Sequence, residues 1–228
     1  MKDGAHLHHT SQTIKSLSLW ERGGPKALEV TPRYFTLPNL TALNISKSYW
    51  NSSTRVWNER AVADFLTRSA CSLTSLYLSE VPLRDRQVIT LLELTPTLTI
   101  FKIDEYRDMP PGDWLITGMF LRRFVVVHEP ESLLSSRTFP SRLADVALRV
   151  TQKDGLVEKD FFDMVSTRWL PDADQAKKFG VDCLRSVRIT IEANGDSNST
   201  VGGHGLSLDS LECFRDAGLR LDIYQIIP

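Results

Sequence analysis

Histidines are the first candidates for chemistry in this 228-residue chain. His6, His8 and His9 lie close enough together near the N-terminus to capture a transition metal weakly, but no fixed set of further ligands accompanies them. His204 lies in a glycine-rich stretch that lacks the Lys and Ser or Thr of a phosphate-binding loop. We therefore expect these histidine side chains to be solvated and not to form a metal or phosphate site.

Thiols and carboxylates are the next candidates. Cys71, Cys183 and Cys213 have no neighbouring histidine or activating motif, and their odd number fits neither a disulfide framework nor a zinc site. Asp104 and Glu105 resemble an acid–base pair, but carboxylates near strand ends are normally solvated. The absence of a Gly-x-Ser-x-Gly motif leaves a small α/β hydrolase as a remote alternative. We therefore expect a protein that is not an enzyme and that binds no metal or cofactor.

Composition narrows the class of protein. Lys and Arg together number 27 and Asp and Glu 28, so the net charge of -1 argues against a nucleic-acid partner. No run approaches the roughly 18 to 20 apolar residues that span a bilayer, and the N-terminus lacks the apolar stretch of a secretory signal. We expect an intracellular monomer, in the cytoplasm or nucleus, with no membrane partner.

A repeated triplet of apolar residues predicts the strands that would position any functional side chain. Residues at positions 1, 4 and 6 of a short segment are apolar seven times, with starts 22 to 41 residues apart. Alternation at positions 4 and 6 predicts a strand with one buried face. The triplets are Ile14, Leu17, Leu19; Leu40, Leu43, Ile45; Leu73, Leu76, Leu78; Leu98, Phe101, Ile103; Leu121, Phe124, Val126; Leu143, Val146, Leu148; and Leu184, Val187, Ile189. A last strand is expected at Leu219, Leu221 and Ile223.

Helical spacing lies between several of these strands. The expected apolar faces are Val62, Phe65, Leu66 and Ser69; Val88, Leu91 and Leu92 after an N-cap at Asp85; and Phe162, Val165 and Trp169. Asp209 and Glu212 have capping-box spacing, and Gly218 is the expected C-cap of the final helix. Strand, turn and helix in repetition predict an α/β fold, an irregular leucine-rich-repeat solenoid with a curved parallel sheet on its concave side. A doubly wound sheet is disfavoured because no glycine-rich first loop is present.

The expected organisation is one repeat domain over residues 13–228, with about seven repeats and a helix–strand cap at about 207–228. A flexible tail is expected over 1–12 and a flexible loop over 193–205, within a longer Ala193–Gly205 stretch of loop composition. Gly23–Pro32 and Met109–Trp114 are also expected to be loops.

Five stretches within the array have a recognisable sequence. They are LTRSACSLTSLYL at 66–78, VPLRDRQVITLLELTPTLT at 81–99, DMVSTRW at 163–169 followed by LRSVRI at 184–189, and FRDAGLRLDI at 214–223. In order and spacing they resemble the leucine-rich region of mushroom-type fungal F-box proteins. That resemblance implies a horseshoe that holds a target protein for an Skp–cullin–F-box ubiquitin ligase.

The chain departs from this family plan before the repeats. Only 13 residues precede the first predicted strand, which leaves no room for an F-box. We therefore expect a non-catalytic protein-binding module, the target-recognition part of an F-box-type receptor without its own F-box. Skp adaptor and cullin are expected partners only if an F-box lies upstream. The alternative is a truncated or degenerate structural repeat protein with no ligase role.

The predicted concave face supplies the candidate binding residues. Side chains alternate along a strand, so positions 3, 5 and 7 of each unit point away from the core. This column changes from aromatic and hydroxyl-rich to arginine-rich along the chain and predicts a partner with acidic groups. The expected binding residues are Trp20, Asn44, Tyr77, Lys102, Arg149 and Arg188.

Overall fold

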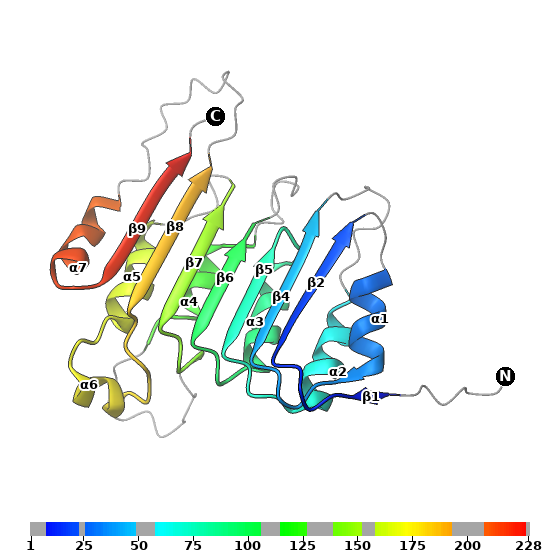
Figure 1. The fold of residues 1–228 in the computed structure, drawn as a ribbon. Coiled ribbons are helices and arrows are strands. Elements are labelled where there is room, and N and C mark those ends of the chain that lie inside the picture. Colours follow the sequence, from blue (N-terminus) through cyan, green and yellow to red (C-terminus); the bar gives the residue numbers. More distant parts are fainter. Residues whose placement is uncertain are drawn as a thin grey trace, which may run out of the picture.

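A seven-stranded parallel β-sheet organises the chain (Figure 1). The computed structural model describes residues 8–22, 26–48, 58–105, 115–126, 139–151, 158–192 and 208–226. Its strands are β2 Ser16–Arg22, β4 Ala42–Ser48, β5 Ser75–Ser79, β6 Ile100–Asp104, β7 Asp145–Val150, β8 Ser186–Glu192 and β9 Arg220–Ile226. Each strand pairs in parallel with the next one in this series, so the sheet grows in one direction along the chain.

Two columns of apolar side chains run across one face of this sheet. The first contains Leu17, Leu43, Leu76, Phe101, Val146, Val187 and Leu221, and the second contains Leu19, Ile45, Leu78, Ile103, Leu148, Ile189 and Ile223. On the five inner strands none of these side chains is more than 3% exposed. Burial of each such side chain stabilises the fold by roughly 1.5 to 3 kcal/mol. The predicted strands are therefore confirmed wherever the triplets fall on these columns.

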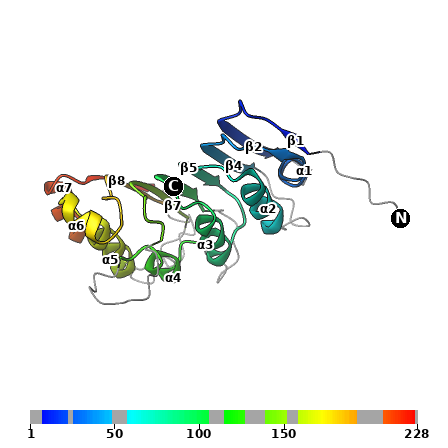
Figure 2. The same ribbon diagram turned by 90° about the horizontal axis from the view of Figure 1, so that it is seen from below.

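Four helices cover the apolar face: α2 Glu59–Ser69, α3 Asp85–Glu93, α4 Gly118–Arg122 and α5 Glu158–Arg168. They lie on the same side of the sheet in both views (Figures 1 and 2), and their buried residues share one core cluster with the strands. Among the described residues, no helix lies on the opposite face. The expected α/β class with a parallel sheet is confirmed.

Helix α2 illustrates how local sequence sets the helix limits. The Asn58 side chain accepts a hydrogen bond of 3.0 Å from the backbone N–H of Ala61, which caps the N-terminus. Val62 and Phe65 lie on the buried face, as the spacing predicts. The helix ends where Ala70 takes a left-handed conformation with φ 46°.

A helix replaces part of the loop expected at Gly23–Pro32. Helix α1 spans Lys26–Tyr34 and contains Pro32. Ala, Leu and Glu near its start have high helix propensity, which outweighs the loop signal of the flanking glycines. The carbonyl of Pro32 accepts a hydrogen bond from the guanidinium of Arg68 on α2, so tertiary contact also holds this helix.

The fifth predicted triplet does not form a strand. Leu121 lies in α4, and Phe124 and Val126 follow it in a turn and an irregular segment. Thr117 caps the helix by accepting a hydrogen bond of 3.1 Å from the N–H of Phe120. The ring centroids of Phe120 and Phe124 lie 4.9 Å apart. Apolar spacing of three residues suits a helix as well as a strand entry, and here the aromatic packing favours the helix.

Arg168, at the end of α5, is completely buried. Its guanidinium donates from Nε to the Phe124 carbonyl (2.5 Å), from Nη1 to Pro140 (2.9 Å) and from Nη2 to Phe139 (2.9 Å). Burial lowers the pKa of this group to about 10, so it stays charged at neutral pH. Of the predicted apolar face of α5, Val165 is buried, and Phe162 and Trp169 are partly buried against the same core. The fully buried face is larger than predicted. It consists of Asp160, Phe161, Met164, Val165 and Arg168.

Two predicted N-caps are wrong. The N-cap of α3 is Arg84, and Asp85 is the first helical residue. Near the C-terminus a 3-10 turn over Leu208–Leu211 precedes the short helix α7, Glu212–Asp216, whose N-cap Leu211 has no capping side chain. The predicted capping box at Asp209 therefore does not start this helix. Gly218 has φ 103°, as a helix-terminating glycine requires.

The smaller elements lie around the main sheet. Strands β1 His9–Thr10 and β3 Phe35–Thr36 form a two-stranded parallel pair, so the expected flexible tail over 1–12 contains a paired segment. Helix α6 spans Ala173–Lys178. Residues 1–7 and the loop expected at 193–205 lie outside the described part, as do residues 106–114.

Candidate functional site

Two rows of side chains cross the sheet face that points away from helices α2 to α5. Together they are called the polar face. The tyrosine row contains Ser18, Asn44, Tyr77, Lys102, Ala147, Arg188 and Asp222. The aspartate row contains Trp20, Ser46, Ser79, Asp104, Arg149, Thr190 and Tyr224. All six predicted binding residues fall on these rows because side chains alternate along every strand.

Asp104 is the centre of a hydrogen-bonded group on β5 and β6. Its Oδ2 accepts a bond of 2.5 Å from the Tyr77 hydroxyl and one of 3.3 Å from Ser79 Oγ. Burial and the bond to Asp104 raise the pKa of Tyr77, so the phenol stays a proton donor. The hydrogen bond to Asp104 orients the tyrosine ring on the face.

Arg149 on β7 pairs with Glu192 at the end of β8. Nε of Arg149 donates to Oε1 of Glu192 at 2.8 Å, and Nη2 bonds the same oxygen. This bond is the main reason that the pKa of Arg149 is raised, with Asp104 and Glu80 contributing further negative charge. The side chain of Glu192 is 12% exposed and that of Arg149 35%, so the pair is partly shielded from water.

A second ion pair joins β8 to β9. Nη2 and Nε of Arg188 donate to Oδ2 of Asp222 at 3.1 and 3.4 Å. Arg220 approaches the same oxygen at 3.9 Å. Sequence reasoning missed Asp222 and Glu192 as partners, because their proximity to the arginines follows only from the strand register.

These pairs change the electrostatics expected of the arginine-rich end. Arg149 and Arg188 each have a carboxylate on the next strand, so neither offers an unbalanced positive charge to a partner. Lys102 is exposed and forms no ion pair within the described ranges. Lys102 is therefore the member of the predicted set whose charge remains available.

The N-terminal strands contribute Trp20 and Asn44. Trp20 is 61% exposed on the edge strand β2. Asn44 is half-buried, and its Oδ1 has no hydrogen-bond donor among the residues that the structure describes. Asn44 is thus the register neighbour of Tyr77, and Trp20 lies one strand farther out on β2.

Glu105 is not the solvated carboxylate that the sequence suggested. It is 2% exposed, and it accepts hydrogen bonds from the backbone N–H groups of Leu115 (3.0 Å), Ile116 (2.9 Å) and Thr151 (3.3 Å). Burial raises its pKa, and the three N–H groups offset that effect only in part. Glu105 therefore links the backbone of Leu115 and Ile116, which precede α4, to that of Thr151, which follows β7.

Two of the cysteines are poor candidates for nucleophiles. Burial raises the pKa of the Cys71 and Cys183 thiols, which disfavours the thiolate that a nucleophile requires. Within the described ranges no three His, Cys, Asp or Glu side chains converge as a metal site. In that same part of the chain no helix is both long and apolar enough to cross a bilayer.

Comparison with protein-family models, with curated proteins and with solved structures finds no match for this chain. The class that the fold itself defines is a parallel α/β protein with helices on one face of its sheet and an ionic, aromatic polar face on the other.

Proposed function

We propose that this chain is a non-catalytic leucine-rich-repeat module that binds a protein through the polar face. Support comes from the strictly sequential strand order and from helices that lie on one side, since a stack of strand–helix units produces both. A doubly wound sheet would place helices on both faces and reverse its strand order. The resemblance to fungal F-box proteins extends the proposal to target recognition for a ubiquitin ligase, with adaptor and cullin recruited by an F-box supplied upstream.

The single observation that carries the proposal is the ordered group on the central strands. Tyr77 is held by Asp104, and Arg149 is held by Glu192. Aromatic and arginine side chains contribute most to many protein interfaces, and fixing them before binding lowers the entropy lost on association. The polar face therefore has the residue types and the rigidity of a binding surface.

The partner is expected to be acidic where it meets Lys102. This ammonium group lies between Tyr77 on β5 and Ala147 on β7 in the tyrosine row, and it has no carboxylate partner among the described residues. A carboxylate of the partner opposite Lys102 would supply the negative charge that balances this ammonium group. Trp20 and Tyr77 would supply apolar contact area on the same surface.

Affinity purification followed by mass spectrometry tests the proposal with two charge reversals. Lys102→Glu lies on the polar face, whereas Arg86→Glu changes an exposed arginine on α3, on the helix side of the sheet. Proteins captured by the wild type should be lost with Lys102→Glu and retained with Arg86→Glu, while both variants keep the wild-type melting temperature. Equal capture by the wild type and Lys102→Glu would count against the polar face as the binding surface.

A further inference from the structure

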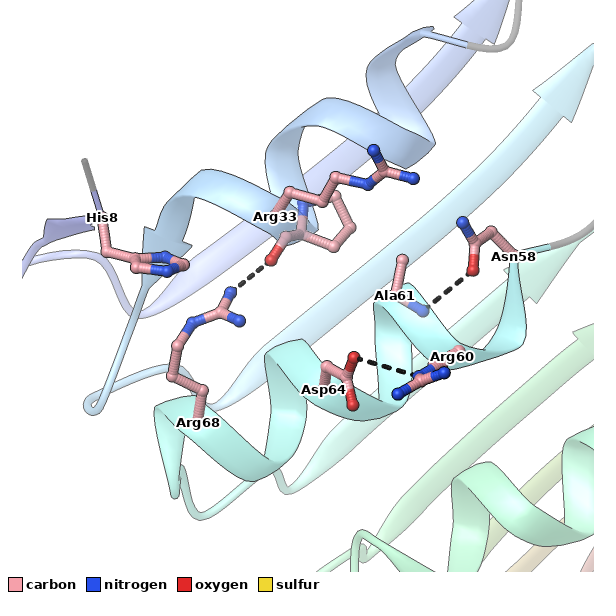
Figure 3. Close-up of a pocket in the computed structure, with 8 residues that line it drawn as sticks. His8, Arg33, Asn58, Arg60, Ala61, Asp64 and Arg68 are labelled. Atoms are coloured by element: carbon pink, nitrogen blue, oxygen red, sulfur yellow. Dashed lines mark hydrogen bonds and ion pairs between the residues drawn. The ribbon is translucent and has the colours of Figure 1, made fainter. Parts of the chain in front are cut away.

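A pocket of about 230 Å³ lies between α1 and α2, away from the polar face (Figure 3). Basic side chains dominate its lining. The polar lining residues are His8, Arg33, Asn58, Arg60, Asp64 and Arg68. They come from three separate stretches of the chain, so the pocket exists only once α1, α2 and His8 have packed together.

Arg68 is held in this pocket by neutral groups. Its Nε donates to Thr36 Oγ1 at 3.2 Å, and its Nη2 donates to the carbonyls of Phe35 (2.8 Å) and Pro32. Within the described ranges Nη1 makes no hydrogen bond, and the nitrogen not bonded to Pro32 points into the pocket (Figure 3). Carbonyl and hydroxyl oxygens orient this guanidinium without cancelling its charge.

The other charged groups leave the pocket positive. Arg33 is exposed and forms no ion pair with any described residue. Arg60 approaches Asp64 at 3.9 Å, but the two side chains are 91% and 64% exposed, so their attraction is weak. Three guanidinium groups and one carboxylate therefore line the pocket, together with His8 (Figure 3).

We propose that this pocket binds a phosphate group, carried either by a small molecule or by a phosphorylated side chain. Guanidinium groups match phosphate oxygens with paired N–H donors, and a dianion accepts several such donors at once. Arg68 supplies the oriented donor, and the exposed side chains of Arg33 on α1 and Arg60 on α2 line the same pocket. The inference is independent of the proposed function because its residues do not lie on the polar face.

Isothermal titration with inorganic phosphate at low ionic strength tests the site. Arg33→Gln should weaken phosphate binding by about tenfold, because a charged donor is lost. Asp64→Asn should strengthen it, because the carboxylate in the pocket is removed. Arg86→Gln, which removes an exposed arginine from α3 outside the pocket, should leave binding unchanged.

Three results would overturn the assignment: no saturable binding of phosphate by the full chain, acetate binding as tight as phosphate, or equal weakening by Arg33→Gln and Arg86→Gln. Two further probes distinguish the sources of the phosphate. Tighter binding of a phosphoserine peptide than of phosphate assigns a modified side chain, whereas tighter binding of a sugar phosphate assigns a small molecule. All three variants change exposed side chains, so the folded protein remains available for each measurement.

Discussion

The hydroxyl of Tyr77 on β5 donates a hydrogen bond of 2.5 Å to the carboxylate of Asp104 on β6. The two residues lie 27 positions apart in the chain and on neighbouring rows of the polar face. This bond links the aromatic part of the face to its charged part, because Asp104 also lies near Arg149 and raises the pKa of that arginine.

Removing the Tyr77 hydroxyl should destabilise the protein modestly. Tyr77→Phe leaves Asp104 with Ser79 as its remaining hydroxyl donor, which should lower the free energy of unfolding by about 1 kcal/mol. Urea unfolding measures this loss. Tyr224→Phe is the matched control, since Tyr224 is 50% exposed at the far end of the same face. Equal losses in the two variants would show that the bond to Asp104 contributes nothing.

Replacing the buried Arg168 should destabilise the protein strongly. Arg168→Met removes the donors that the carbonyls of Phe124, Phe139 and Pro140 use, and each unsatisfied buried group costs roughly 1 to 3 kcal/mol. We expect a fall of about 3 kcal/mol or more in the free energy of unfolding. Arg168→Lys should give an intermediate loss, because an ammonium cannot reproduce the planar fork.

The control for Arg168 is Arg142→Met, which alters an exposed arginine just before β7. Its unfolding midpoint in urea should stay near that of the wild type. A similar midpoint for Arg168→Met would contradict the role of the guanidinium in joining α5 to the segments before β7.

Glu105 should make stability depend on pH. Burial raises its pKa above the ordinary value of 4.5, so the folded state holds this proton more tightly than the unfolded state. The stability that follows is complete below pH 4.5 and is lost as the pH rises through the higher folded-state pKa. Urea unfolding at a series of pH values should show this decline in the wild type.

Glu105→Gln should abolish that part of the pH dependence while its amide oxygen still accepts backbone N–H groups. Glu158→Gln, at the half-buried start of α5, should retain the wild-type profile. An unchanged profile in Glu105→Gln would mean that Glu105 titrates alike in the folded and unfolded states.

Deleting residues 208–228 should yield aggregated protein. The deletion removes β9 and the buried side chains Leu211, Leu219 and Leu221, and it exposes the edge of β8 with its apolar residues. Removal of residues 1–7, which precede β1, should change little. Solubility on size-exclusion chromatography and the sharpness of thermal unfolding measure both outcomes. A soluble, cooperatively unfolding deletion would show that β9 does not protect the sheet.

Sequence alone determined the seven strands of the main sheet and the face to which each of their side chains belongs. Leu43 and Ile45 alternate with polar neighbours, as do Leu76 and Leu78. Along a strand, such alternation places all the apolar side chains on one face, which is the buried one. The same alternation placed Tyr77 and Lys102 on the polar face. It did not decide the segment around Leu121 and Phe124, because apolar spacing there fits both a helix and a strand.

Tertiary structure decided every interaction between distant residues. Arg149 meets Glu192 across 43 positions, and Arg168 reaches Phe124 across 44. Such partners depend on strand register and helix packing, which local periodicity does not encode. Arg68 became the fixed donor of a basic pocket because α1 formed where a loop was predicted. The electrostatics of both proposed sites therefore depend on tertiary packing, which the residue types alone do not reveal.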